Sequence, residues 1–216
     1  MAAVDLSHPI DHGTRTYPGF PPVSISDYWD HDNEGWQISQ VTFVSSSGTY
    51  LDAPLHRHPQ GLGVADLPLS SCVDLPGIKI VAHEAKIESS ITSVGPEDLA
   101  GRAVLINTGW ADKWGSPEYR EQGKHPGLSG VAVDHLLEAG VRLVGIDSLN
   151  IDYLADESDD VNGHNRFLDA GVPIVEQLTN LASLPTKGFR FSAAPLALVA
   201  TGSCPVRAYA IVPDTA

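Results

Sequence analysis

The stretch Ser47–His58 constrains the fold of this chain more than any other part of the sequence. Gly48 and Pro54 interrupt regular helix and strand, so the backbone here is expected to form a tightly shaped turn. Asp52 and His56 stand four residues apart on that turn. Carboxylates and imidazoles supply acid/base chemistry at neutral pH and bind divalent metals, so the turn is predicted to carry a functional site.

A second pair of such residues lies downstream, at His164 and Glu176. His164 stands at the expected start of a short helix, and Glu176 ends a strand that is otherwise apolar. A carboxylate in such a strand needs a partner, because burying it unpaired is costly. A metal ion, a histidine, Arg166 or Arg190 would each serve as that partner. The plausible set of divalent-metal ligands consists of Asp52, His56, His164 and Glu176.

The composition is that of an acidic globular protein. Its 216 residues are 42% hydrophobic, which suits one domain over residues 1–216 with a sizeable core. The formal net charge of -14 repels phosphate groups, so neither nucleic acid nor an anionic membrane is expected as a partner. The start lacks a basic region followed by an apolar run, and no apolar run is long enough to cross a bilayer. A cytoplasmic location is therefore expected, with Cys72 and Cys204 as buried thiols.

Apolar runs and turn signals predict an α/β chain with more strand than helix. Ala103–Gly109 and Val141–Asp147 are mostly apolar, which is typical of parallel strands buried on both faces. Between them Ser129 is expected to cap a helix that Gly140 ends, which gives a strand–helix–strand unit. Further strands are expected at Trp36–Val44, Gly77–Ala82, Val172–Glu176, Phe189–Ser192, Leu196–Ala200 and Val206–Val212, with a short helix at Asn165–Ala170.

Motifs for other kinds of chemistry are absent from the sequence. It contains no Gly-x-Ser-x-Gly nucleophile elbow, no phosphate-binding glycine loop and no Cys-x-x-Cys pair. Trp29 and Trp110 are candidates to line an apolar substrate pocket, although core packing is the usual role of a single tryptophan.

The whole pattern resembles the cyclase family of metal-dependent hydrolases, which includes bacterial kynurenine formamidase and isatin hydrolase. The family signature reads His-x-Gly-Thr-His-x-Asp-x-Pro-x-His, and the matching stretch here is Ser46–His56. The resemblance implies a swivelling β/β/α domain with a mixed β-sheet core and peripheral helices. It covers nearly the whole chain, continuing in matching order through Gly145–Ser148, His164, Ile174–Leu181, Leu184–Pro185, Gly188–Phe191 and Pro205–Ala208.

Two departures from the signature bear on the chemistry. Ser46 and Tyr50 stand where the family has its first two signature histidines. In hydrolytic members those histidines and the signature aspartate hold a catalytic metal, and of that trio only Asp52 is present here. The first metal position of the family is therefore expected to be empty. The residues that surround a second ion in two-metal members are matched by Asp52, His56, His164 and Glu176.

Three functions remain open at this point. The first is a hydrolase of a small amide, lactone or cyclic carbonyl compound that uses one zinc or manganese ion at the second position. The second is a metal-independent cyclase, lyase or isomerase, in which His56, oriented by Asp52 or Glu176, removes a proton and Tyr50 acts as acid or oxyanion donor. In the hydrolase, His56 or His164 is the alternative general base. The third is a non-catalytic relative that binds a ligand.

The resemblance also bears on partners. Members of the family are usually homodimers or homotetramers, and an N-terminal segment can reach the pocket of a neighbouring subunit. Residues 27–31, which include Trp29, are the candidate for such a segment. The expected substrate is a small molecule, and Arg57 is a candidate to pair with its carboxylate, or with a surface acidic group instead.

Overall fold

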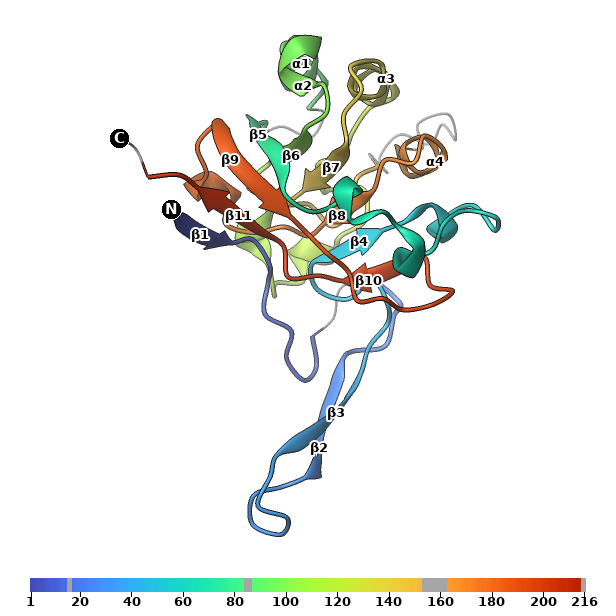
Figure 1. Cartoon of the computed structure of the whole chain (residues 1–216), viewed down its shortest axis with the longest axis vertical. Helices are drawn as coiled ribbons and strands as arrows, with labels where there is room; N and C mark the ends of the chain where they lie inside the picture. Colours follow the sequence, from blue (N-terminus) through green and yellow to red (C-terminus); the bar gives the residue numbers. More distant parts are fainter. Residues whose placement is uncertain (15–16, 84–86, 153–162, 215–216) are drawn as a thin grey trace.

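A curled, mixed β-sheet organises the chain (Figure 1). We describe residues 1–14, 17–83, 87–152 and 163–214 of a computed structural model. Within these residues the sheet has nine strands, in the order β1-β11-β9-β5-β6-β7-β8-β4-β10. Their bounds are β1 (Ala2–Asp5), β4 (Tyr50–Asp52), β5 (Leu75–Val81), β6 (Ala103–Asn107), β7 (Leu143–Ile146), β8 (Ile174–Glu176), β9 (Lys187–Ser192), β10 (Ser203–Pro205) and β11 (Tyr209–Val212).

The middle of the sheet, β5–β6–β7–β8, is parallel, as the apolar runs in the sequence predict. Successive side chains of β6 point to opposite faces, so that Val104 and Ile106 join one hydrophobic cluster and Leu105 joins another. Every residue of β6 is buried. Since strands on both sides of this parallel centre run antiparallel, the predicted α/β class with a mixed sheet is confirmed.

The helices lie along one side of the sheet (Figure 1). They are α1 (Glu88–Thr92), α2 (Pro96–Leu99), α3 (Gly130–Glu138) and α4 (Gly163–Asp169). Ser129 caps α3 as predicted, because its Oγ accepts a hydrogen bond from the N–H of Ala132 at 3.4 Å. Gly140 follows the helix with a φ of 73°, a conformation that favours glycine.

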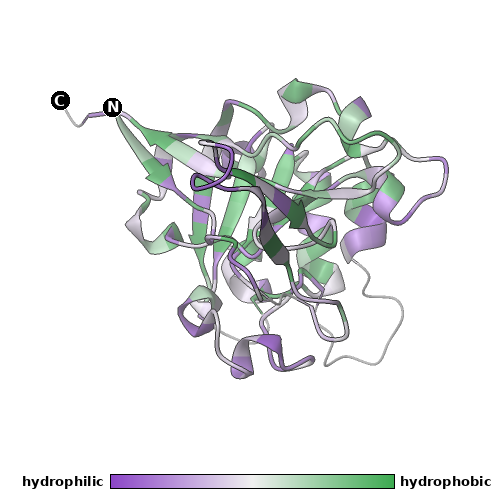
Figure 2. Cartoon of the chain, turned by 90° about the horizontal axis from the view of Figure 1, so that it is seen from below, coloured by the Kyte–Doolittle hydropathy of each residue, from purple (hydrophilic) through white to green (hydrophobic). Residues whose placement is uncertain are grey.

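Short 3-10 helices complete the connections between these elements. They are η1 (Pro54–His56), η2 (Val64–Asp66), η3 (Leu69–Ser71), η4 (Trp110–Lys113), η5 (Glu118–Arg120) and η6 (Leu181–Ser183). Figure 2 shows apolar residues concentrated in the strands and polar residues on outer helices and loops. Cys72 and Cys204 are buried free thiols, as expected. Among the described residues, no helix combines the length and apolar character needed to span a bilayer.

The structure also differs from the predicted strands: the strand at Val206–Val212 is limited to β11 (Tyr209–Val212), and β4 and β10 are not among the predicted strands. Two further differences are larger. Leu196–Ala200 is not a strand, because the N–H of Leu198 turns back to the carbonyl of Leu196 and Ala200 has a left-handed φ of 58°. The strand predicted at Trp36–Val44 is shorter, β3 (Ile38–Thr42), and does not join the main sheet.

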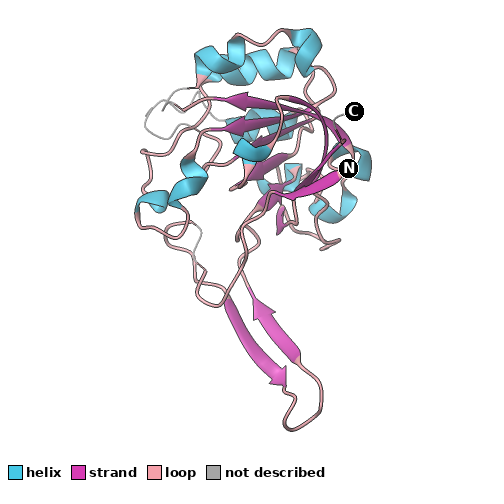
Figure 3. Cartoon of the chain, turned by 90° about the vertical axis from the view of Figure 1, so that its left-hand side faces the viewer, coloured by secondary structure: helices cyan, strands magenta, loops and turns pink. Residues whose placement is uncertain are grey.

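β3 pairs instead with β2 (Ser24–Trp29) in a separate antiparallel hairpin. We call residues 24–42 the arm. It projects from the body of the molecule on the side away from the helices (Figures 1 and 3). All residues of β3 are exposed, including the apolar Ile38 and Val41. The arm therefore presents apolar side chains that nothing among the described residues covers.

Candidate active site

Pairing between β4 and β8 brings the two halves of the sequence pattern together. The strands are antiparallel, with Tyr50 opposite Glu176 and Asp52 opposite Ile174. Asp52 and Glu176 are fully buried, and Tyr50 is nearly so. The buried polar side chains are therefore fixed by backbone hydrogen bonds of a sheet and not by a mobile loop.

The bend after β4 carries His56. Pro54 opens the short helix η1, and the N–H of His56 donates to the carbonyl of Ala53 at 2.8 Å. Two glycines allow the chain to close around this bend: a Cβ on Gly202 would lie 2.5 Å from the Cα of His56, and one on Gly61 would lie 2.6 Å from the carbonyl carbon of Pro54. The sequence reasoning missed both glycines; the contact of Gly202 with His56 joins residues that are distant along the chain.

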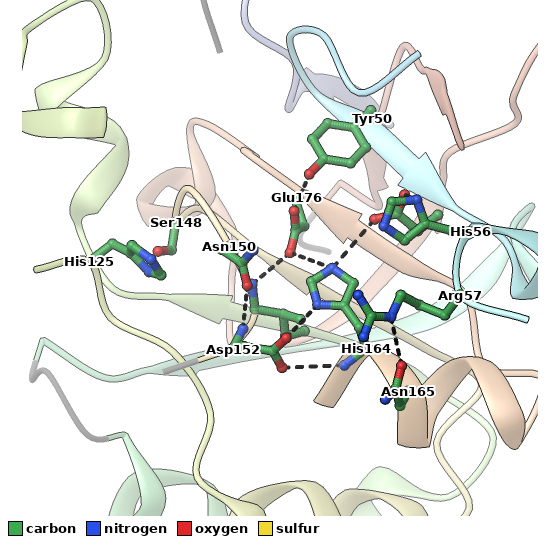
Figure 4. A network of polar contacts seen from close by, with 12 residues as sticks. Tyr50, His56, Arg57, His125, Ser148, Asn150, Asp152, His164, Asn165 and Glu176 are labelled. Atoms are coloured by element: carbon green, nitrogen blue, oxygen red, sulfur yellow. Dashed lines mark hydrogen bonds and ion pairs between the residues drawn. The ribbon is translucent and has the colours of Figure 1, made fainter. Parts of the chain in front are cut away.

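His164 enters the site from the first turn of α4. Its Nε2 lies 3.7 Å from Oδ2 of Asp52 and 3.3 Å from Oε1 of Glu176. The Nδ1 of His56 lies 3.5 Å from Oδ1 of Asp52. One ligand atom each from Asp52, His56 and His164 can be chosen so that all lie within 4.8 Å of one another. The structure thus brings these candidate residues into one cluster, and Figure 4 shows its His56 and His164 side by side with Glu176.

The state of Asp52 is the test of whether a metal ion fits here. Both of its carboxylate oxygens are buried, and neither has a hydrogen-bond partner among the described residues. Burial raises the pKa of Asp52, although the proximity and charges of His164 and His56 oppose that rise. A buried carboxylate with unused oxygens, beside two imidazoles, is a donor set that suits one zinc or manganese ion. The residues present therefore fit a single divalent cation.

Glu176 lies beside this cluster but outside the group of three that could share an ion. The Tyr50 hydroxyl donates to its Oε2, and the N–H of Ile151 donates to its Oε1 at 2.6 Å. The arginines considered as partners of Glu176 form ion pairs elsewhere, Arg166 with Asp134 and Arg190 with Asp74. The partners of Glu176 are thus a tyrosine, a backbone amide and a histidine.

The environment of Tyr50 determines the protonation state of its phenol. Burial, followed by the charges of Glu176 and Asp52, raises the pKa of Tyr50 well above its ordinary value. The phenol therefore stays neutral, and its hydrogen is already donated to Glu176. The resemblance places Tyr50 at the position of a signature histidine, and a neutral phenol is a poor substitute for imidazole as a metal ligand.

The pKa of His164 is also strongly perturbed by its surroundings. Burial alone would lower its pKa, but the charge of Glu176 and the hydrogen bond to Asp152 outweigh burial. The pKa of His164 is consequently well above its ordinary value in the metal-free protein. An excess of buried negative charge around one imidazole is the electrostatic environment that attracts a cation.

A cavity of about 320 Å³ opens over this cluster. Such a volume suits a small organic molecule. Arg57 reaches the cavity, and its Nε donates to Oδ1 of Asn165 at 2.6 Å. The aromatic side chains at the cavity belong to the N-terminal loop and to β4. The lining consists of Tyr17, Phe20, Ser46, Tyr50, His56, Arg57, Asn150, Asp152 and His164.

The two tryptophans proposed for the substrate pocket lie elsewhere. Trp110 is buried, donates its Nε1 hydrogen to the carbonyl of Tyr119 at 3.1 Å and packs in a cluster with Tyr119 and Leu149. It is a core residue, which corrects its assignment as a substrate contact. Trp29 belongs to the arm and does not line the cavity of its own chain.

Asp152 and Asn150 are site residues that the sequence reasoning missed. Oδ2 of Asp152 lies 2.7 Å from Nδ1 of His164, and the N–H of Asp152 donates to Oδ1 of Asn150 at 2.7 Å. Their only signal in the sequence is that both follow the end of a buried parallel strand, β7, where side chains of α/β proteins commonly form sites.

Known proteins resemble this chain over nearly its full length. The family described as "Putative cyclase" matches residues 4–153. A kynurenine formamidase of Geobacillus thermodenitrificans is 30% identical over 208 residues, which cover 95% of each chain. Isatin hydrolase A from Ralstonia solanacearum superposes with a TM-score of 0.85 at 25% identity and covers 98% of this chain and 92% of its own.

A further solved structure, described as a "predicted metal-dependent hydrolase" from Bacillus stearothermophilus, has a TM-score of 0.77 at 26% identity and covers 97% of both chains. This chain therefore belongs to the cyclase family.

Proposed function

We propose that this protein hydrolyses the carbonyl carbon–nitrogen or carbon–oxygen bond of a small amide, lactone or cyclic carbonyl compound and uses one divalent metal ion, zinc or manganese, held by Asp52, His56 and His164. The observation that carries the proposal is the buried Asp52 carboxylate, whose oxygens have no hydrogen-bond partner among the described residues. Two relatives support the reaction class, since one is named a kynurenine formamidase and the other an isatin hydrolase.

Each residue of the site would have its own role in binding and orienting the substrate. A bound divalent cation supplies a Lewis acid that polarises a carbonyl and makes water nucleophilic at neutral pH. Asn150 lines the cavity and uses its Oδ1 for Asp152, which leaves its amide N–H groups to donate to a substrate oxygen. Arg57 provides a cation for an anionic group of the substrate. Tyr17 and Phe20 provide apolar surface for a ring.

The test combines metal content with turnover. Protein purified without a metal-affinity step is expected to contain about one equivalent of zinc or manganese by mass spectrometry. That protein should hydrolyse members of a panel of aryl formamides, lactones and imides, and a chelator should abolish the activity. Turnover that a chelator leaves unchanged, or a metal-loaded protein inactive on the whole panel, would contradict the proposal.

We further propose that the protein works as a homodimer or homotetramer in which the arm contacts a second copy. A two-stranded hairpin alone is marginally stable in water, and this arm exposes Tyr28, Trp29 and Trp36, the last by 69%. Such aromatic side chains are typical anchors of protein interfaces. Nucleic acid and an anionic membrane are less suited than a second copy as partners of the arm, because the net charge of -14 repels their phosphate groups.

Replacing Trp29 and Trp36 by serine is expected to weaken self-association by at least about 100-fold, since buried interface tryptophans each contribute about 2 kcal/mol or more. Sedimentation analysis over a range of protein concentrations measures this change. Val199→Ser is the matched control, because Val199 is also exposed but lies outside the arm. A wild-type protein that sediments as a monomer throughout would contradict the proposal.

A further inference from the structure

Asp152 holds His164 at two points. Its Oδ2 lies 2.7 Å from the ring Nδ1 of His164, and its Oδ1 accepts the backbone N–H of the same residue at 3.3 Å. Both residues are buried, Asp152 at 7% exposure and His164 at 6%. The opposite ring nitrogen, Nε2, faces Asp52 and Glu176. The carboxylate therefore contacts the histidine on the side away from the candidate metal ligands (Figure 4).

Asp152 is itself held in place. Its N–H donates to Oδ1 of Asn150 at 2.7 Å, and it forms a parallel bridge with Leu128. Gly163, the residue before His164, has no side chain to push the carboxylate away: a Cβ there would lie 2.9 Å from Oδ1 of Asp152. A carboxylate anchored from several sides can fix the ring that it bonds.

We infer that Asp152 is a positioning residue, which holds the His164 ring with a proton on Nδ1 and with Nε2 directed at the metal-binding cluster. A histidine that binds a metal commonly donates its other ring N–H to a carboxylate, which sets the ring orientation and raises its strength as a ligand. The inference rests on the proposed function for the assignment of His164 as a ligand. The contact between Asp152 and the ring stands without it.

If Asp152 had a purely structural role, its substitution would have a different effect. Oδ1 of Asp152 satisfies a backbone N–H in the first turn of α4, and loss of that bond alone would lower thermal stability. It would leave the ring proton and the metal affinity of the folded protein unchanged. These two properties therefore separate positioning of the ring from capping of the helix.

The direct readout is the proton on Nδ1 of His164. In protein labelled with ¹⁵N-histidine, a ring proton bonded to a buried carboxylate is expected to exchange slowly and to resonate downfield. The signal is assigned by its loss in His164→Ala. It is expected to disappear in Asp152→Ala and to shift in Gly163→Ala, in which the carboxylate stays but is displaced. Metal-free protein suffices for this measurement.

The second readout is the affinity for Zn²⁺, measured by competition with a chromophoric chelator. Asp152→Ala is expected to weaken binding by about 10- to 100-fold. Asp169→Asn is the matched control, because it also removes one carboxylate charge, at an exposed residue of α4 whose carboxylate contacts His58 and not His164. That variant should bind Zn²⁺ like the wild type.

The outcomes distinguish this inference from the proposed function. If the ring signal and the affinity respond while no amide is hydrolysed, Asp152 positions His164 and the proposed reaction is wrong. If the wild type binds no Zn²⁺, the ring signal alone decides. If Asp152→Ala does not fold, Gly163→Ala decides. An unchanged ring signal in the folded variants would overturn the inference.

Discussion

Replacing Asp52 by asparagine is expected to abolish metal binding and to lower kcat/KM by at least about 10³-fold, which corresponds to about 4 kcal/mol of transition-state stabilisation. The substitution keeps the size of the side chain and removes its charge. Asp52 is the residue that both histidines of the cluster face, at 3.5 Å and 3.7 Å. Without its charge no remaining carboxylate belongs to the group of three that can share an ion.

The same substitution is expected to leave the fold intact or make it more stable. Burial raises the pKa of Asp52, so the folded protein disfavours its charged form and a neutral amide removes that cost. Metal content by mass spectrometry, kcat/KM and the melting temperature together test the prediction. Asp66→Asn serves as a control with the same charge change on an exposed residue of η2. Full activity with no bound metal in Asp52→Asn would contradict the metal mechanism.

Gly202→Ala is expected to cause the second large loss of activity. It adds one methyl group beside the backbone of His56, a residue that is distant along the chain. That methyl group would lie 2.5 Å from the backbone N and Cα of His56, and these atoms cannot rotate away as a flexible side chain can. Overpacking of this kind costs about 1–3 kcal/mol of stability. Displacement of a site residue by roughly 1 Å lowers activity by about 100-fold.

Gly140→Ala is the control that separates positioning from stability. Alanine at position 140 would be strained, because the φ of Gly140 is 73°, but its Cβ would meet nothing within 4 Å. It should lower the melting temperature without changing kcat/KM. Equal kcat/KM for Gly202→Ala and the wild type would show that the bend at Pro54–His56 tolerates displacement.

The sequence is sufficient to predict the parts of the site that rest on local pattern. Asp52 and His56 share one turn, and the parallel strands at the centre of the sheet follow from apolar runs such as Ala103–Asn107. The close approach of Gly202 to His56 and the contact of Asp152 with His164 depend on how distant segments pack, which no local pattern encodes. Leu196–Ala200 has strand-like composition but lies in an exposed turn.

The same limit applies to Glu176. An apolar strand predicts that its carboxylate needs a partner, but several partners satisfy that requirement equally from sequence alone. The pairing of β4 with β8 decides among them, because it places Tyr50 directly opposite Glu176. A replaced signature residue thus acquires a structural meaning only once the strand register is known.

The arm also determines how two copies of this protein can meet. A two-stranded hairpin has two edges with unpaired backbone groups, and such edges invite pairing with strands of other molecules. Asp27, Asp30, Asp32 and Glu34 lie on the arm and would face like charges if two arms aligned edge to edge. Extension of the hairpin into a longer intermolecular sheet is therefore disfavoured. The aromatic faces of the arm are left as the surface for ordered association, which allows a projecting hairpin without aggregation.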